Sequence, residues 1–450
     1  MIGRRLEYQS QKAVLLHMDA NVRFLISLHM PSIERVEKLV PLRIRRLSMN
    51  DCHTRVNDTH YEIGVIRHFP EGNAPRLLEE ELIEGGSPFD LDAFGFRLSS
   101  NVLLPGDVAF RRGNHDFQYD TVVNEQMDRN QLRVHEKALE IRNQLTSQGV
   151  FVEDYLRSLK PPTDEEARRG EHAVRFYLRY SSDFLSMRIE KLKVSLLPFD
   201  WRRNNTKVPF TCYIQLVIMN EIQGSRQFQR FEYNKKLFEA SKRLHEVLFG
   251  GRIMPIQVKR FKSSFDDAIY RLPVGFRLQV QKACIFHHSI TYQGLPLIVE
   301  NLESLKTLKL LRPSMQSDEY EHQIIRNATR VIIAGTYEGV LEPLFPVVRG
   351  LQNREICIRQ LNKDCLPAFY ITMMDAWWHE GRQVGASLWM RTGNERIARE
   401  VLEVILKRCE NSRRTERCIT VPLSNSTTLE ASCGPHREES WMLKMHIVKV

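Results

Sequence analysis

The sequence lacks the long apolar segments and the cysteine patterns that define several large protein classes. No uninterrupted apolar run reaches the roughly 18 residues that a membrane-spanning helix requires. Residues 1–5 are followed by polar side chains instead of the apolar core of a secretory signal peptide. None of the eight cysteines forms a Cys-x-x-Cys pair, and their spacing matches neither a zinc frame nor a disulfide framework. We therefore expect a cytoplasmic or nuclear protein with reduced thiols and no membrane association.

The sequence also lacks the common catalytic motifs. It has neither type of glycine-rich phosphate-binding loop, no His-Glu-x-x-His, no Gly-x-Ser-x-Gly and no protein-kinase motif set. His287 and His288 are adjacent, so on a strand they would point to opposite faces and could not bind one ion together. We predict no catalytic, cofactor-binding or metal-binding residues, and hence a non-enzymatic protein that acts by binding.

What is present is the composition of a folded, basic protein. Apolar residues make up 42% of the 450 residues and aromatic residues 9%, as in globular chains. This length allows about two to four units of hydrophobic core. The net charge of +10 would attract acidic peptides or nucleic acid, but the 65 lysine and arginine residues are dispersed without a long basic block. An ordinary solvated surface is the simpler interpretation of this charge.

Three apolar stripes with helical spacing crowd residues 1–41, which we predict to form a small helical module. Pro31 and Pro41 mark the ends of the second and third stripes. A module of this size cannot bury three stripes by itself, so part of the apolar surface should face a partner or the rest of the chain. The stripes consist of Val14, Leu15 and Met18, then Val22, Leu25, Ile26 and His29, then Ile33, Val36, Leu39 and Val40.

After residue 41 the apolar period changes from helical to alternating, and residues 42–122 are predicted as an antiparallel β-meander followed by loops. Residues 123–197 are predicted to form a charged helical segment. We expect one helix from about Asn124 to Gln148 and a second from a capping box at Thr163 to about Val194. The two polar helices form either an arm or a pair packed on the main body, and the pattern fits both.

Residues 198–450 contain a quasi-repeat of short strand-like runs with helix-like segments between several of them. Leu302, Leu305, Leu308 and Leu310 reproduce the core pattern of a leucine-rich repeat. We predict a leucine-rich-repeat-like α/β body, a degenerate solenoid in which each strand lies beside its predecessor, within a chain of the α+β class. An ordinary mixed α/β domain is the alternative. The runs begin near Ile256, Leu278, Leu305, Arg330, Glu355, Ala386 and Cys418.

The N-terminal residues resemble an F-box, the short helical module by which ubiquitin-ligase receptors hold a small adaptor subunit. The matching residues are Leu6, the run Val14–Met18 and the run Asp19–Leu28. Most of the chain is similar to the nematode F-box C group of F-box-associated proteins, whose large domain has no established activity. The stretches that carry this wider resemblance are 23–42, 89–96, 103–108, 196–199 with 203–206, 233–242 and 248–252.

The resemblance implies a substrate-recognition subunit of a cullin-RING ubiquitin ligase, whose C-terminal body binds a target protein. The alternative is an interaction scaffold or a basic nucleic-acid-binding protein, in which the helices only cap the solenoid. The net charge favours this alternative, as does Glu7, which follows Leu6 where F-boxes carry proline. Under the first interpretation, the residues expected to contact the adaptor are Leu15, Met18, Val22, Leu25 and Ile26.

Overall fold

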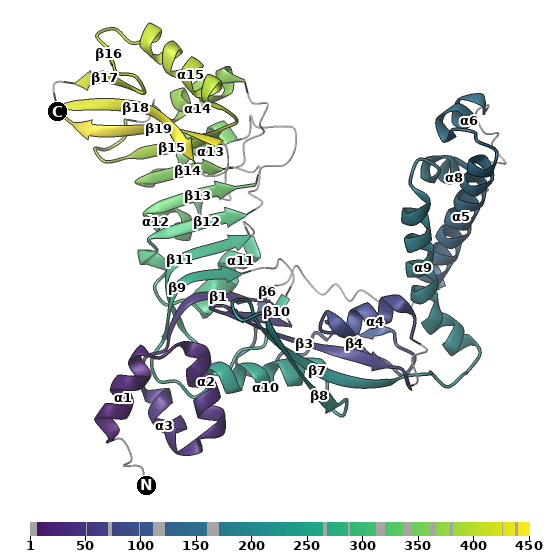
Figure 1. Cartoon of the computed structure of the whole chain (residues 1–450). Helices are drawn as coiled ribbons and strands as arrows, with labels where there is room; N and C mark the ends of the chain where they lie inside the picture. The colour runs from purple at the N-terminus through teal and green to yellow at the C-terminus, as the bar shows by residue number, and fades with distance from the viewer. Residues whose placement is uncertain are drawn as a thin grey trace.

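One large mixed sheet runs through this mixed α/β protein, with helices packed along it and two further helical regions attached (Figure 1). The described residues contribute 15 strands to this sheet, in the order β16-β17-β18-β19-β15-β14-β13-β12-β11-β9-β1-β2-β3-β7-β8. The computed structural model describes residues 7–50, 52–70, 74–98, 100–110, 122–159, 171–263, 268–286, 289–311, 320–335, 344–359, 366–378, 381–424, 426–436 and 440–450.

Three short helices form the N-terminal region, as predicted: α1 (Tyr8–His17), α2 (Ala20–His29) and α3 (Pro31–Leu39). The Asp19 carboxylate accepts a hydrogen bond of 2.9 Å from the backbone N–H of Asn21 and so caps α2. Pro31 is the first residue of α3, where its missing N–H leaves no helical hydrogen bond unmade. These local signals separate the helices by only one or two residues.

The predicted β-meander is present in the middle of the sheet. Strands β1 (Arg43–Met49), β2 (His53–Val56) and β3 (Thr59–His68) pair antiparallel in sequence order. Asn57 adopts a φ of 57° in the turn between β2 and β3, a left-handed conformation that asparagine tolerates better than most residues. Strand β1 also pairs parallel with β9 (Ile256–Ser263), and β3 pairs antiparallel with β7 (Thr211–Asn220), which pairs with β8 (Ser225–Glu232).

The segment after the meander holds short elements: α4 (Arg76–Ile83), β4 (Asp90–Leu91), β5 (Arg97–Leu98) and β6 (Val108–Phe110). Strand β6 pairs with β10 (Ala268–Tyr270). The buried Asp107 carboxylate binds Lys242 of α10 (Leu237–Phe249) at 2.9 Å and Arg271 at 2.8 Å. These ion pairs tie the loop region to the sheet.

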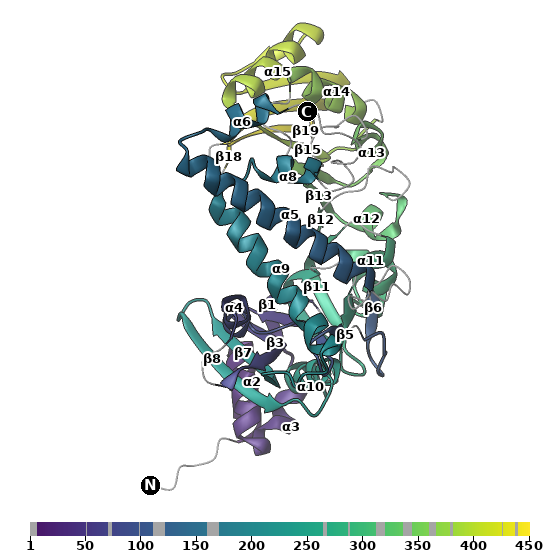
Figure 2. The same cartoon turned by 90° about the vertical axis from the view of Figure 1, so that its right-hand side faces the viewer.

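The charged segment forms a helical arm that projects away from the sheet (Figures 1 and 2). It consists of α5 (Val122–Ser147), α6 (Val152–Ser158), α8 (Glu171–Tyr177) and α9 (Ser182–Arg203). Ala138, Val174, Leu178 and Leu185 give the arm its own small core, and Leu196 and Phe199 pack with Phe96 at its base.

The prediction of one continuous second helix is wrong. The chain breaks between α8 and α9, where the Ser181 hydroxyl accepts a hydrogen bond of 3.2 Å from the Phe184 N–H and starts a new helix. The break lets α8 and α9 both pack on α5 around one core. The expected capping box at Thr163 lies outside the described residues.

Beyond β9 the sheet continues as parallel neighbours: β11 (Leu278–Phe286), β12 (Thr307–Leu311), β13 (Arg330–Ala334), β14 (Glu355–Arg359) and β15 (Ser387–Thr392). Their connections include α11 (Ser289–Gly294), η2 (Leu295–Leu297), η3 (Leu302–Ser304), α12 (Gln323–Asn327), α13 (Leu344–Gly350) and α14 (Pro367–Trp378). All seven predicted strand starts are confirmed to within two residues, and the first six strands pair in parallel as consecutive neighbours.

The seventh strand begins at Cys418 as predicted, but it does not lie beside its predecessor β15, so that part of the prediction is wrong. Strand β17 (Cys418–Ser424) pairs antiparallel with β18 (Thr427–His436), and β18 pairs antiparallel with β19 (Ser440–Lys449), which lies against β15. The few residues between β17, β18 and β19 allow only hairpins there, because a parallel crossover needs a dozen or more residues. Strand β19 occupies the position beside β15, so β18 and β19 lie between β15 and β17. Helix α15 (Glu395–Arg408) packs on this hairpin region, and β16 (Arg413–Arg414) ends the sheet.

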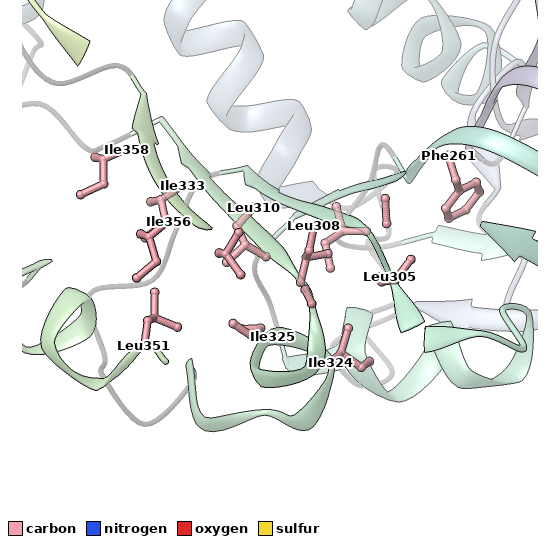
Figure 3. Packing of buried hydrophobic residues seen from close by; sticks show 14 of the residues in the cluster. Phe261, Leu305, Leu308, Leu310, Ile324, Ile325, Ile333, Leu351, Ile356 and Ile358 are labelled. Carbon is pink, nitrogen blue, oxygen red and sulfur yellow. The ribbon is translucent and has the colours of Figure 1, made fainter. Parts of the chain in front are cut away.

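The main hydrophobic core lies between the parallel strands and the connecting helices. Leu308 and Leu310 of β12 and Ile333 of β13 are fully buried toward Ile324 and Ile325 of α12 (Figure 3). The alternate residues of the same strands point to the opposite face of the sheet, which we call the open face. Among the described residues, no helix is both long and apolar enough to cross a membrane.

Candidate functional site

A buried ion cluster fixes the N-terminal helices to the sheet region. Arg23 of α2 is 1% exposed and contacts Glu37 of α3, which is fully buried, with Nη2 and Oε1 2.8 Å apart. Arg252, which follows α10, contacts the same carboxylate at 2.9 Å. Burial lowers the pKa of the Arg23 guanidinium, and the Glu37 charge opposes that shift.

Arg23 also donates hydrogen bonds to three backbone carbonyls, those of Glu37, Val40 and Pro41, at 2.9, 2.9 and 2.7 Å. One side chain therefore closes the C-terminal end of α3 and the chain that leads into β1. Because the donors are charged and Arg23 is buried, these hydrogen bonds are strong and fix the angle of the helices.

A second set of contacts joins α2 to the meander. The Asn57 side-chain amide donates to Asp19 at 2.8 Å, and the Asn21 amide donates to the Val56 carbonyl at 3.0 Å. Tyr61 donates its hydroxyl to Asn21 at 3.0 Å, and Phe24 packs edge-on against a ring of α10. One side of α2 is therefore fully used for attachment to the body.

The other side of α2 carries exposed apolar side chains, which we call the docking face. Val22, Leu25 and Leu28 are 44%, 54% and 60% exposed. Val14 of α1 and Met30, which follows α2, are also exposed, each at 46%. Large exposed apolar side chains grouped on anchored helices are typical of protein interaction sites.

The five predicted adaptor-contact residues are therefore not equivalent. Val22 and Leu25 are exposed, and Met18 and Ile26 are half-buried. Leu15 is only 3% exposed, so the expectation that it lies on the surface is wrong. Helix α1 packs against α3, and Leu15 is its buried residue, while its neighbour Val14 faces outward.

The open face of the sheet is a second surface with a distinct character. The strand register places Lys262, Cys284 and Lys309 side by side on β9, β11 and β12. The same row continues through Ile332 and Cys357 to Trp389 and Lys444. Basic and apolar side chains thus meet on neighbouring strands.

Trp389 is the centre of this row. It is half-buried and packs with the buried Ile332, Cys357 and Met442. The Lys444 ammonium lies 4.9 Å from its ring centroid and the Arg330 guanidinium 5.9 Å, distances at which cations are attracted to the ring face. An indole flanked by two cations suits an acidic or aromatic segment of a partner.

A second row of register partners, two residues along the strands from the first row, is also basic. Arg46, Arg260 and Lys282 are register partners on β1, β9 and β11, and all three are exposed. The row continues through Thr307 to Arg330 and its register partner Glu355, and the last two side chains form an ion pair at 3.4 Å. The open face therefore concentrates part of the positive charge that looked dispersed in the sequence.

Sequence reasoning missed the ion cluster and the basic rows for different reasons. The basic rows could have been predicted, because charged and apolar residues alternate in β1 and β9 and this alternation indicates that one face of each strand is solvated. No local pattern links Arg23 with Arg252, because these residues meet only through the packing of α2 against α10.

Comparisons with known proteins add one finding. A family profile described as a domain of unknown function (DUF3557) matches residues 236–394. This region holds α10 and the parallel strands from β9 to β15, and it excludes the N-terminal helices and the arm. No curated protein and no solved structure matches the chain.

Proposed function

We propose that this chain is a non-enzymatic receptor subunit of a cullin-type ubiquitin ligase. In this proposal the helices α1 to α3 act as an F-box-like module that binds a small adaptor subunit, and the body holds a target protein. The observation that carries the proposal is the docking face, where Val22, Leu25 and Leu28 remain exposed on a helix whose other side is anchored by buried ion pairs.

The adaptor-contact set follows from exposure. Val14, Val22 and Leu25 are its centre, with Met18 and Ile26 at the edge, and Leu15 supports them from inside the module. A rigid backbone under exposed apolar side chains reduces the entropy lost on binding. The rigidity comes from Arg23 and Glu37, so the module reaches its partner already ordered.

We interpret the parallel part of the body as a degenerate solenoid that resembles leucine-rich repeats, with the open face as its target-binding surface. The basic rows and Trp389 favour a target with an acidic segment. Catalysis then belongs to other subunits, and this chain supplies proximity and orientation. A protein with this role works in the cytoplasm or nucleus.

Co-purification from native extract tests the adaptor contact. The full chain is compared with Leu25→Asp and with Ile222→Asp, a matched control because Ile222 is 77% exposed in the turn between β7 and β8. We expect adaptor and cullin subunits with the parent chain and with Ile222→Asp, and their loss with Leu25→Asp. Equal far-ultraviolet circular dichroism spectra establish that the variants fold. Recovery of the adaptor by Leu25→Asp, or no adaptor with any of the three, contradicts the proposal.

The basic rows also favour a second candidate function, binding of nucleic acid along the open face. Binding measured against single-stranded RNA and duplex DNA at increasing salt decides this case, because each phosphate contact adds about 0.7 to 0.9 to the slope of log affinity against log salt. A Lys262→Glu and Lys309→Glu double variant should reduce that slope by about two contacts. Undetectable binding at low salt removes this candidate.

A further inference from the structure

Three potential metal ligands converge on the open face of the meander. His53 lies on β2 directly opposite Glu62 of β3, and His60 lies two residues before Glu62 on the same face. His53 Nε2 is 2.8 Å from His60 Nδ1 and 3.7 Å from a Glu62 carboxylate oxygen. One donor atom from each of the three residues lies within 4.8 Å of the other two.

The second ring nitrogen of His60, Nε2, has a carboxylate partner of the kind that metal-binding histidines commonly have. His60 Nε2 is 2.7 Å from a carboxylate oxygen of Glu221, so Nε2 carries the proton and donates it. Nδ1, the nitrogen that faces His53, is then left with its lone pair. Histidine ligands commonly donate their second N–H to a carboxylate, which fixes the tautomer and raises the basicity of the ligating nitrogen.

The spacing of the donors also fits a small ion. Tetrahedral zinc with ligands at about 2.0 to 2.1 Å has donor atoms roughly 3.3 Å apart. The two observed separations, 2.8 and 3.7 Å, lie on either side of that value, so small side-chain rotations suffice. Two imidazoles and a carboxylate are a common zinc ligand set with a fourth position open to water.

Two cations lie near the cluster and oppose an added charge. Arg55 donates to Glu221 and to the Asn57 carbonyl, with the Glu221 contact at 2.5 Å, so its charge is partly compensated. Lys262 is exposed to solvent on the open face. Neither cation is among the three donor residues, and the donor geometry is set by β2 and β3.

We infer that His53, His60 and Glu62 bind a divalent transition-metal ion of the zinc class, with Glu221 holding His60 in the required tautomer. Binding moves the proton of His53 to its Nδ1, since both facing nitrogens must then offer lone pairs. The ion would fix β2 to β3 on the open face. The sequence prediction of no metal site rests on the absence of known zinc motifs and on the adjacency of His287 and His288, which lie outside the described residues, and it does not extend to this hairpin.

Zinc titration of the untagged full chain tests the inference. After removal of metal with a chelator, Zn²⁺ binding is followed by calorimetry and the bound ion is counted by elemental analysis. We expect one equivalent of Zn²⁺ that is lost in His53→Ala and weakened at least tenfold in Glu62→Gln. Glu221→Gln should weaken binding about 10- to 100-fold, because the second N–H of His60 loses its charged acceptor and Arg55 loses its counter-charge.

The matched control is His68→Ala, since His68 is an exposed histidine at the end of the same strand β3. It should bind Zn²⁺ like the parent chain. Melting temperatures of the metal-free variants within about one degree of the parent show that the fold is kept. Equal Zn²⁺ binding by the parent and His53→Ala, or no binding by the parent, overturns the inference. Neither result bears on the adaptor contact, which is on other residues.

Discussion

The buried cluster of Arg23, Glu37 and Arg252 allows a sharp prediction about stability. Glu37 is fully buried and is the common partner of two guanidinium groups, which are 1% and 5% exposed. The substitution Glu37→Gln keeps the size of the side chain but removes the negative charge. It leaves two buried cations facing each other without their counter-charge.

The magnitude follows from this arrangement. Removing one partner of a buried ion pair typically destabilises a protein by about 3 to 5 kcal/mol, because an uncompensated charge stays buried. Because two buried guanidinium groups lose their counter-charge at once, we expect Glu37→Gln to lie at the upper end of that range. Glu34→Gln is the matched control, since Glu34 lies one turn earlier on α3 and is exposed, and surface changes of this kind alter stability by less than about 0.5 kcal/mol.

Hydrogen exchange is the appropriate assay, because the N-terminal helices can open without unfolding of the whole sheet. The amides of α2, including Phe24, should exchange at least a hundredfold faster in Glu37→Gln, whereas amides of β13 should not change. Urea unfolding gives the global value for comparison. A loss of protection below tenfold in α2, or equal effects of Glu37→Gln and Glu34→Gln, would refute the view that this cluster anchors the module.

Three further outcomes are expected. Leu308→Ala should lower the free energy of unfolding by about 2 to 5 kcal/mol in urea titrations, because it opens a cavity in the main core, while the adjacent Lys309→Ala on the open face should change it by less than about 1 kcal/mol. Asn57→Ala should lower it by about 1 to 3 kcal/mol, since alanine disfavours the left-handed φ of 57° and cannot bond Asp19; an unchanged urea midpoint would contradict this. His245 is buried with its pKa lowered to about 4, so unfolding takes up a proton below pH 6.5, and stability should fall as pH drops from about 6.5 to 4, by no more than about 3 kcal/mol. The slope of stability against pH should become shallower in His245→Gln, and an unaltered slope would count against this assignment.

The parallel part of the fold was predictable because each of its strands repeats one local pattern. Leu308 and Leu310 alternate with Thr307 and Lys309, and Val331 and Ile333 belong to a short apolar run rich in β-branched residues. At Cys418 the same pattern predicted the strand but not its place in the sheet, because β19 occupies the position beside β15. Strand direction there depends on the few residues that separate β17, β18 and β19, and on which edge of the sheet is free to accept a strand.

The candidate sites divide in the same way. Helical spacing identified the apolar stripes of α1 and α2. It could not distinguish the buried Leu15 from the exposed Val14 beside it. Both residues lie on an amphipathic helix, and only the direction from which α3 packs decides which of them is covered.

The sequence alone determined the three N-terminal helices, the meander, the charged helical segment and six of the parallel strands, because these depend on spacing, caps and turns within about ten residues. Tertiary structure decided which faces stay open and which distant groups meet. Glu37 joins Arg23 to Arg252, and Glu221 supports His60 across 161 positions of sequence. Contacts of this kind arise from packing and sheet register, and no period in the sequence records them.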